Sequence, residues 1–367
     1  MNKLLWDISG AFGDIGVLFP LAIALIAKNG MNPTALFLMA GIFYVISAFY
    51  FRITMPVQPL KAMFAIAVAS GLGYGVINAA GITMGVILIF IAVTGISARL
   101  GEVFPISVIR GIQLGLGAML VRTSFGLMSP DLVTALVVGI ILMLTITMLK
   151  KIPPLIPVLA LGAALSFKGT ALSSIGPVAL TPAFPGLDDL WTGFMVLVIP
   201  QLALTFGNAI VATRETGRFL YGTRAERLNL KSIPLSMGIA NIASGLVGGA
   251  PMCHGCGGLT AHYKFGAKDQ QSGYLIGFTL ILFALLFGRS AVAVISAFPT
   301  GILGVLLCYV GIQHALFIKD IMNDKKAVLI ALTVGMLGFA LGNLTIGFLA
   351  GLTLHYGLSG IKKIVKE

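Results

Sequence analysis

Charged residues are scarce in this chain. They account for 10% of its 367 residues, and hydrophobic residues account for 58%, whereas a soluble domain carries about 25% charged residues. No hydrophilic stretch is long enough to form a soluble domain. We therefore expect an all-α polytopic membrane protein, because a spanning backbone must satisfy its own polar groups.

Cysteine and acidic residues are also few. Three cysteines do not make a disulfide framework. Asp14 is the only acidic residue well inside an apolar segment. Met1–Trp6 runs into a long apolar segment without an A-x-A-like site, so we expect no cleavable signal.

The apolar pattern predicts fourteen segments, seven in each half. The third of each half is short and broken, since about 20 residues are needed to span a membrane. The expected segments are Ser9–Ala27, Thr34–Phe51, Ala62–Ala69, Gly81–Ala98, Phe104–Val121, Leu132–Leu149, Pro154–Phe167, Leu190–Thr213, Ser232–Val247, Gly258–Tyr263, Tyr274–Phe287, Ala297–Leu316, Ala327–Leu341 and Leu344–Leu358.

Two stretches at membrane depth cannot be continuous helices. Pro56 and Pro59 exclude a regular helix before Pro59, which itself suits the first turn of a new one. Gly248–Gly258 places glycines on both sides of Pro251. Such backbone must be buried in protein or line a cavity, and broken helices of this kind hold anionic substrates in many secondary transporters.

The two halves share landmarks at one spacing. Phe12-Gly13-Asp14 recurs as Phe206-Gly207-Asn208, and Phe104-Pro105 recurs as Phe298-Pro299, each 194 residues later. This common offset predicts an internal repeat. An odd number of segments per repeat makes the second half inverted.

Lysine and arginine predict the orientation. With the N-terminus inside, 18 of the 24 lie on inner loops and termini, 4 lie on outer loops, and Lys61 and Arg110 lie within segments. We expect a multi-pass protein of the inner (plasma) membrane with both termini cytoplasmic. The net charge of +12 then faces anionic lipid and does not indicate nucleic acid.

Four blocks of residues carry a family resemblance over nearly the whole chain. The blocks are Phe12–Gly16 with Pro20, Pro56–Ala62, Pro200–Leu202 with Gly207–Ala209, and Pro251–Gly255 with Gly257–Leu259 and Phe265–Ala267. With them the chain resembles the molybdate transporters of the sulfate-permease-like superfamily.

That resemblance implies a seven-plus-seven inverted-repeat transporter with broken third and tenth segments. It also implies a core domain, residues 1–98 and 190–292, that moves against a gate domain, residues 99–189 and 293–367. Substrate would sit between the broken segments. Relatives of this fold are often dimers, so the resemblance allows a homodimer. Cys256 stands where family members usually have a small residue.

The chemistry of the breaks favours a tetrahedral dianion. Two helix N-termini facing one point present N–H donors and two positive dipole ends. Lys61 is placed to supply the remaining charge, or else it extends to the interface near Arg52. Gln58 either donates its amide N–H to an oxyanion or caps the break.

Further candidates for substrate binding are Asn208, Cys253, His254 and Gly255. His254 donates either to the anion or to backbone, and Asn208 bonds either backbone or substrate. Asp14 would repel a dianion, so we assign it structural support or a coupled proton. Cys253, His254 and Cys256 lack a fourth zinc ligand, so we expect no metal and no cofactor.

The sequence thus predicts a secondary active importer of a tetrahedral oxyanion, molybdate first, and not an enzyme. A proton would suit the uptake of an anion into a negative interior. The alternatives are a sulfate permease of the same fold, a nucleobase-type permease, which needs a carboxylate near the site in the second half, and a passive anion channel. An intramembrane redox or metal protein using Cys253, His254 and Cys256 would instead lose activity on Cys256→Ala.

Overall fold

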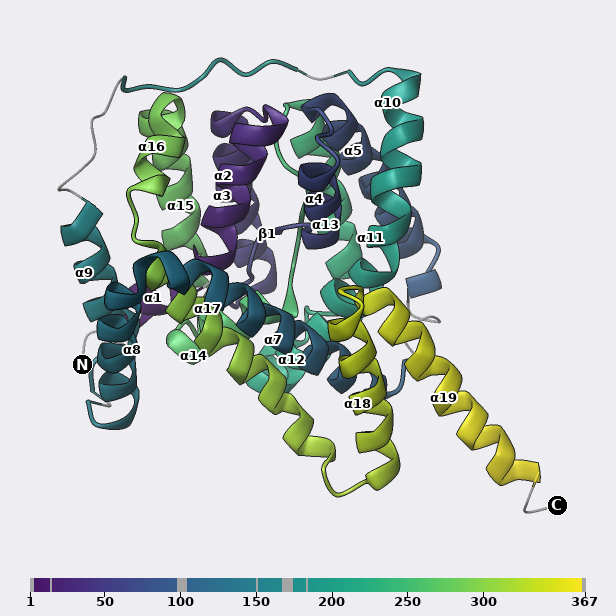
Figure 1. The fold of residues 1–367 in the computed structure, drawn as a ribbon. Helices are drawn as coiled ribbons and strands as arrows, with labels where there is room; N and C mark the ends of the chain where they lie inside the picture. Colours follow the sequence, from purple (N-terminus) through teal and green to yellow (C-terminus); the bar gives the residue numbers. More distant parts are fainter. Residues whose placement is uncertain are drawn as a thin grey trace.

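The computed structural model describes residues 3–13, 15–97, 104–149, 151–166, 174–182 and 184–364. Nearly all of the regular structure is helical (Figure 1). The first half contains α1 (Lys3–Ala11), α2 (Ile15–Asn29), α3 (Pro33–Phe51), β1 (Gln58–Pro59), α4 (Lys61–Ala69), α5 (Tyr74–Val93), α7 (Ile106–Met128), α8 (Leu132–Thr147) and α9 (Leu155–Ser166).

The second half begins with a long bent helix. It is made of α10 (Leu187–Thr192), a π-helical stretch (Gly193–Val198), α11 (Ile199–Leu204), a second π-helical stretch (Thr205–Ala212) and α12 (Thr213–Tyr221). The later elements are α13 (Ser232–Leu246), β2 (Met252–Cys253), α14 (Cys256–Phe265), α15 (Gln270–Phe287), α16 (Ala291–Ser296), α17 (Thr300–Ala315), the 3₁₀ turn η6 (Leu316–Ile321), α18 (Lys325–Ala340) and α19 (Leu344–Ile364).

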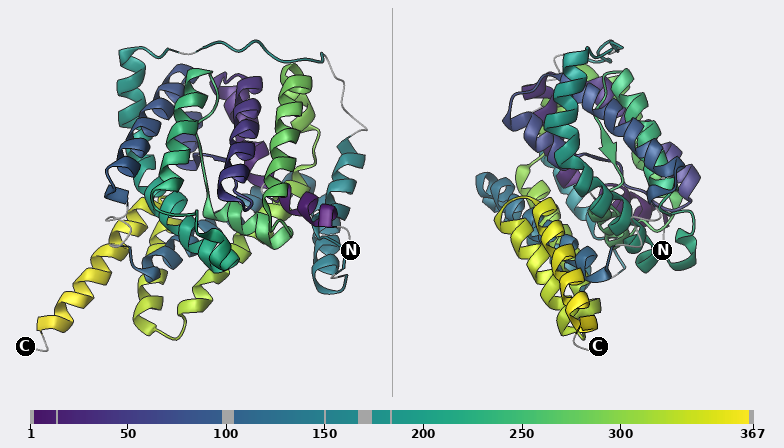
Figure 2. Two further views of the ribbon diagram at one scale, coloured as in Figure 1. Left: turned by 180° about the vertical axis from the view of Figure 1, so that it is seen from behind. Right: turned by 90° about the vertical axis from the view of Figure 1, so that its right-hand side faces the viewer.

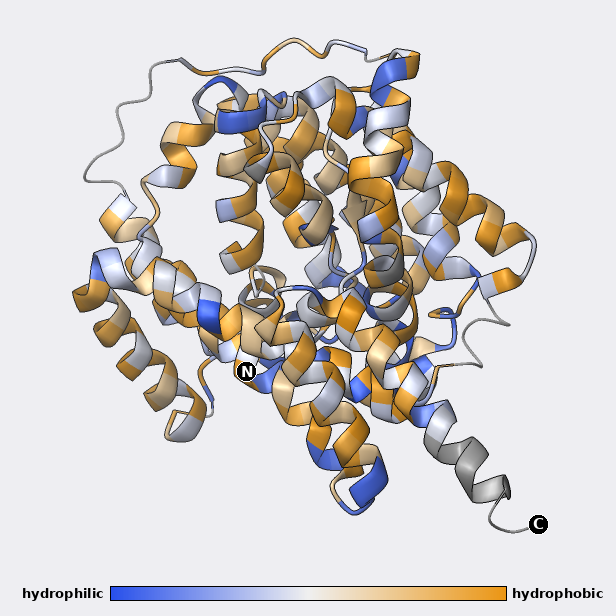
Figure 3. Ribbon diagram, turned by 45° about the vertical axis from the view of Figure 1, so that its right-hand side comes forward, coloured by the Kyte–Doolittle hydropathy of each residue, from blue (hydrophilic) through white to orange (hydrophobic). Residues whose placement is uncertain are grey.

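Membrane-spanning character is clear in the described residues. Six helical stretches are long and apolar enough to cross a membrane, or seven when the bent pair in Leu187–Ala225 counts as one span. Hydrophobic residues colour most of the helices, while hydrophilic ones gather toward helix ends and loops (Figure 3). The short α4 and α14 do not span, as the breaks in the sequence predict.

The predicted 194-residue repeat appears in the element boundaries. Ile106 begins α7, and Thr300, 194 residues later, begins α17. The short strands pair antiparallel, with Gln58 opposite Cys253 and Pro59 opposite Met252. The repeat offset of 194 relates Gln58 to Met252 and Pro59 to Cys253. Exchanging the two halves therefore converts one residue pair into the other, as a pseudo-two-fold axis between the strands requires.

Some predicted boundaries were wrong. The first segment, predicted as Ser9–Ala27, lies inside the longer candidate span Lys3–Asn29, which comprises both α1 and α2. Pro59 lies in strand β1, and its helix begins two residues later at Lys61. The tenth segment begins at Cys256 rather than Gly258, since the backbone is extended only as far as the cap residue, Gly255.

Glycines let the longest helices pack in close pairs. A methyl group on Gly41 of α3 would lie 2.6 Å from the Gly277 carbonyl oxygen on α15, and one on Gly117 of α7 would lie 2.6 Å from that of Gly311 on α17. Close backbone approach through small residues is a common basis of helix association in membranes. Gly111 and Gly115 of α7 approach α18 in the same way, with Ala331 and Gly335 as their backbone neighbours.

Candidate functional site: two opposed helix N-termini

The β1–β2 pair brings the two broken segments to one point near the middle of the molecule. Lys61 begins α4 two residues after β1, and Cys256 begins α14 three residues after β2. The Leu60 amide also donates to the Pro251 carbonyl over 3.3 Å. The first turns of two helices, whose N–H groups lack intrahelical partners, therefore start beside the same strand pair.

Polar side chains from neighbouring helices satisfy the irregular backbone. The Asn241 Oδ1 atom accepts from the Met252 amide at 2.6 Å, and the Ser244 hydroxyl donates to the Ala250 carbonyl at 2.8 Å. The Gln201 Oε1 atom accepts from the Met63 amide at 2.9 Å, in the first turn of α4. Sequence analysis placed Gln201 in a family block but assigned none of these residues a role, although an amide inside an apolar helix is a usable signal.

Gln58 lies over the first turn of α14. It is buried, with 1% of its surface exposed. A methyl group on Gly255 would sit 2.5 Å from its Oε1 atom, and one on Gly258 would sit 2.6 Å from its Nε2 atom. Only glycine at these two positions leaves room for the amide between the helix starts.

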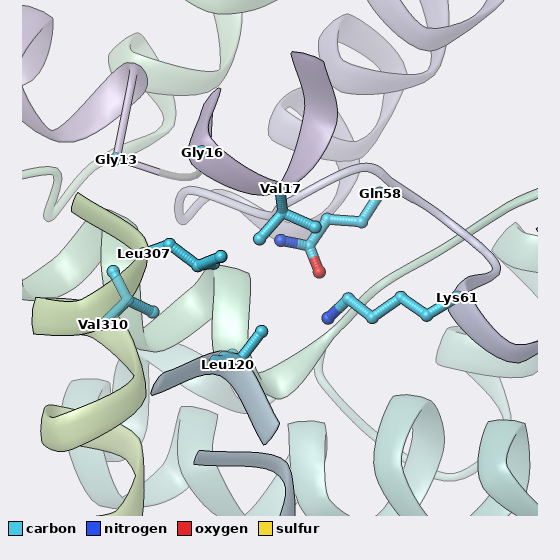
Figure 4. A pocket seen from close by; sticks show the side chains of 9 residues that line it. Gly13, Gly16, Val17, Gln58, Lys61, Leu120, Leu307 and Val310 are labelled. Atoms are coloured by element: carbon cyan, nitrogen blue, oxygen red, sulfur yellow. The ribbon is translucent and has the colours of Figure 1, made fainter. Parts of the chain in front are cut away.

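Lys61 faces the same space from the other helix. Figure 4 shows its ammonium group and the Gln58 amide pointing into one pocket, together with Val17, Leu120 and Leu307. The predicted alternative, an interfacial position, does not describe this side chain, which lines the interior pocket. Among the described residues, which leave out Asp14, no carboxylate forms an ion pair with Lys61.

A larger cavity of about 440 Å³ continues from that pocket and is also lined by Lys61. Asn208 lines it from the second π-helical stretch. A π turn displaces the chain from regular helical spacing and is frequent at functional sites. The Asn208 Oδ1 atom accepts from the Cys256 thiol at 2.7 Å.

His254 lies behind the strands rather than at the cavity. Its Nδ1 atom is 2.9 Å from the Pro56 carbonyl oxygen, and its Nε2 atom is 2.9 Å from the Ser236 hydroxyl. Its ring stacks on Phe43 at 4.8 Å and is fully buried. Of the two roles left open by the sequence, this geometry favours the bond to backbone, which ties one broken segment to the other.

The remaining residues that the sequence pointed to lie in different places. Cys253 is a buried strand residue opposite Gln58, and Gly255 is the cap residue of α14. Asp14, the predicted coupling or support residue, lies outside the described residues. Cys256, left without a role, lies in a buried contact with Asn208 and with His314 of α17. No cluster of metal ligands occurs among the residues that the structure describes.

Comparison with known proteins identifies the family. A family model described as a molybdate transporter of the MFS superfamily matches residues 7–120 and 193–313. The chain belongs to this family. The matched residues include both broken segments, Lys61 and Asn208. The name MFS denotes folds with six spans per half, so the seven-plus-seven architecture here differs from that label.

Curated relatives cover almost the full chain. It is 28% identical to molybdate transporter 2 of Arabidopsis thaliana, over 96% of this chain and 87% of that protein. It is 27% identical to molybdate transporter 1 of Chlamydomonas reinhardtii, over 95% of this chain and 91% of that protein. These relatives are transporters, not enzymes, so the redox-protein alternative loses its support.

Solved structures show the fold. The transmembrane domain of the cyanobacterial bicarbonate transporter BicA superposes with a TM-score of 0.61 over 96% of this chain and 98% of that one, at 19% identity. SLC26A9 superposes with a TM-score of 0.66 over 98% of this chain and 66% of that one, at 14% identity. The chain is thus a polytopic membrane protein with the seven-plus-seven inverted-repeat fold.

Proposed function

We propose that this molybdate-transporter family member is a secondary active importer of molybdate, which binds between the N-termini of α4 and α14. The observation that carries the proposal is the convergence of these helix starts on a pocket lined by Gln58 and Lys61. Backbone N–H groups, an amide and an ammonium are all donors, which suits an anion whose oxygen atoms are all acceptors.

The charge of the site suits a dianion. Each helix N-terminus acts as roughly half a positive charge, and the Lys61 ammonium adds one full charge. The sum is about two positive charges, which balances molybdate or sulfate without a cofactor. A neutral nucleobase would leave this charge uncompensated, and no carboxylate among the described residues lines the cavity to bind its N–H groups.

Alternating access would move the core against the gate, and helix packing supports this division. Within the proposed gate, α17 and α18 pack on α7, and α19 packs on α18; within the proposed core, α3 packs on α15 and α5 on α13. The view at the right of Figure 2 has α18 and α19 in a layer beside the remaining helices. The cavity lies between the two groups, since α4 and α7 both line it. In the proposed orientation, both termini face the cytoplasm.

Calorimetric titration of the purified protein tests the site. Molybdate, tungstate, sulfate and uracil are titrated in parallel into the wild type, Lys61→Ala and Lys325→Ala. Lys325 is an exposed lysine at the start of α18 and serves as the matched loss of one charge. We expect molybdate binding that Lys61→Ala weakens at least tenfold, about 1.4 kcal/mol, and that Lys325→Ala leaves unchanged.

The other ligands separate the alternatives. Sulfate binding without a molybdate preference would make the chain a sulfate permease with the same mechanism. Uracil binding without oxyanion binding would contradict the dianion site. Uptake into proteoliposomes distinguishes a carrier from a channel, because only a coupled carrier concentrates molybdate above its external level.

A further inference from the structure

A buried hydrogen-bonded chain leads from the cavity across the contact between α14 and α17. Asn208 lines the cavity and accepts from the Cys256 thiol over 2.7 Å. The Cys256 Sγ atom lies 3.3 Å from the His314 Nε2 atom, and the His314 Nδ1 atom lies 3.2 Å from the Thr260 Oγ1 atom. His314 is fully buried and belongs to α17, in the proposed gate, while its partners belong to the proposed core.

The hydrogen atoms in this row of hydrogen-bonded side chains can be counted. The Cys256 thiol has one, given to Asn208, and the Thr260 hydroxyl has one, given to the Cys256 carbonyl at 2.9 Å. In this arrangement both partners of His314 present acceptors to the ring, and both ring nitrogens donate. An imidazolium satisfies every contact in this chain.

The neutral ring also fits after one small change. The Thr260 hydroxyl can turn to donate to Nδ1, because the Cys256 carbonyl it releases already accepts the helical N–H of Thr260. Gain or loss of the proton therefore needs one hydroxyl rotation and no movement of heavier atoms. Neither protonation state then leaves a donor of the His314 ring unpaired, which matters because unpaired buried donors are costly.

The charges around His314 make the protonation of its ring depend on whether an anion occupies the cavity. Cys256 of α14 contacts the ring, and the charges of Lys61 of α4 and Arg110 of α7 act on it, while among the described residues Arg110 is paired with Asp320 of η6. With the cavity empty, the Lys61 charge opposes a second positive charge nearby. A bound dianion reverses the sign of the local charge and attracts the proton.

We propose that His314 takes up a proton when a dianion occupies the cavity, so that oxyanion binding and proton binding strengthen each other. The proton comes from solvent and leaves with the oxyanion, as reciprocal linkage requires. The coupling presupposes the oxyanion site proposed above. It assigns the proton to His314 of α17 rather than to Asp14.

Calorimetry in buffers of different ionisation enthalpy measures this uptake directly. Molybdate is titrated near pH 6.5 into the wild type, His314→Gln, His262→Gln and Asp14→Asn. The dependence of the observed heat on buffer enthalpy gives the protons taken up, and we expect up to about one per molybdate, with affinity rising up to about tenfold for each unit of falling pH.

The variants locate the proton. His314→Gln keeps hydrogen-bonding groups and should bind molybdate with uptake near zero. His262 is another buried histidine; it lies on α14, contacts Thr54 and serves as the matched control. His262→Gln and Asp14→Asn should both keep the wild-type proton uptake. If His314→Gln does not fold, Thr260→Val tests the same point, because a protonated ring then lacks the acceptor for Nδ1, and uptake should fall.

Three results would overturn the coupling. The first is molybdate binding to the wild type without proton uptake. The second is unchanged proton uptake in His314→Gln, or in Thr260→Val when His314→Gln does not fold. The third is proton uptake that Asp14→Asn alone abolishes. Absence of molybdate binding in the wild type would instead contradict the proposed function. The two failures are therefore distinguishable in the same experiment.

Discussion

At the scale of single residues, the site depends as much on glycines as on polar side chains. Gln58 fits over α14 only because Gly255 and Gly258 carry no side chain. Gly257 differs, since it lines the pocket and a methyl group there would meet only Leu116 and Leu120, at 3.9 Å or more. Neighbouring glycines thus have separable roles, one in packing and one in the free space of the pocket.

Gly255→Ala should displace the Gln58 amide and weaken molybdate binding at least tenfold, about 1.4 kcal/mol, while lowering the thermal unfolding midpoint. Gly257→Ala should weaken binding, because the methyl group occupies ligand space, and leave the midpoint unchanged. Calorimetry and thermal unfolding of both variants measure the difference. Wild-type affinity in Gly255→Ala would contradict the placement of Gln58.

At the scale of elements, the broken segments are held by side chains from helices that pack behind them. His254 ties β2 to the Pro56 carbonyl, and Ser236 of α13 holds the far side of its ring. Asn241 of the same helix accepts from the Met252 amide. Helix α13 therefore holds the second broken segment in place through the side chains of Ser236 and Asn241.

Ser236→Ala should destabilise the protein while sparing the substrate. The change removes the partner of a buried ring nitrogen, which costs about 1–3 kcal/mol. Thermal unfolding measures that loss, and calorimetry should give a molybdate affinity close to that of the wild type. An affinity loss as large as that of Lys61→Ala would instead place His254 in the substrate site.

A second support joins the helices of the proposed gate to α12. The Arg110 guanidinium bonds both carboxylate oxygens of Asp320 and the Gln113 side chain, and Gln113 donates to the Thr216 hydroxyl of α12. Sequence analysis counted Arg110 among the residues within segments. Its acidic partner lies 210 residues away, so only the folded chain brings the pair together.

Asp320→Asn should leave the Arg110 charge buried with a weaker partner. We expect a loss of about 2 kcal/mol, less than the 3–5 of fully buried pairs, because the Asp320 side chain is 31% exposed and partly screened. Thermal unfolding measures it, with the exposed Glu226→Gln as control. Equal midpoints for the two variants would contradict a stabilising role.

Sequence patterns predicted the breaks, the repeat and the chemical character of the site, because proline, glycine and intramembrane charge are local signals. They did not predict that His254 faces away from the cavity. They also missed the supports from Gln201, Ser236 and Asn241. These depend on which faces of distant helices meet, and apolar helices that are hydrophobic on all sides carry little information about that.

At the scale of the whole molecule, ion pairs connect the N-terminal helix α1 to the second half of the chain. Lys3 of α1 lies 2.6 Å from Asp269, which also pairs with Arg224 beyond α12. The hydrogen bond from Lys3, with a further contribution from Arg224, lowers the pKa of the Asp269 carboxyl below its ordinary value of 3.8. Asp269 thus connects α1, the segment after α12 and the start of α15.

This cluster should make stability depend on acid pH. A carboxyl with a lowered folded-state pKa stabilises the fold above its unfolded pKa, and that contribution is lost as pH falls through the folded value. From neutral pH to about pH 3, the unfolding midpoint should fall further in the wild type than in Asp269→Asn. Parallel curves for the two proteins would show that the cluster contributes nothing.

The whole-molecule account rests on one anion held between two inverted halves. Anomalous X-ray scattering from molybdenum in crystals grown with molybdate locates the ligand without assumptions about mechanism. We predict a peak beside the Lys61 ammonium and the Gln58 amide, between the first turns of α4 and α14. A peak confined to another part of the molecule, with this pocket empty at saturating molybdate, would contradict the account.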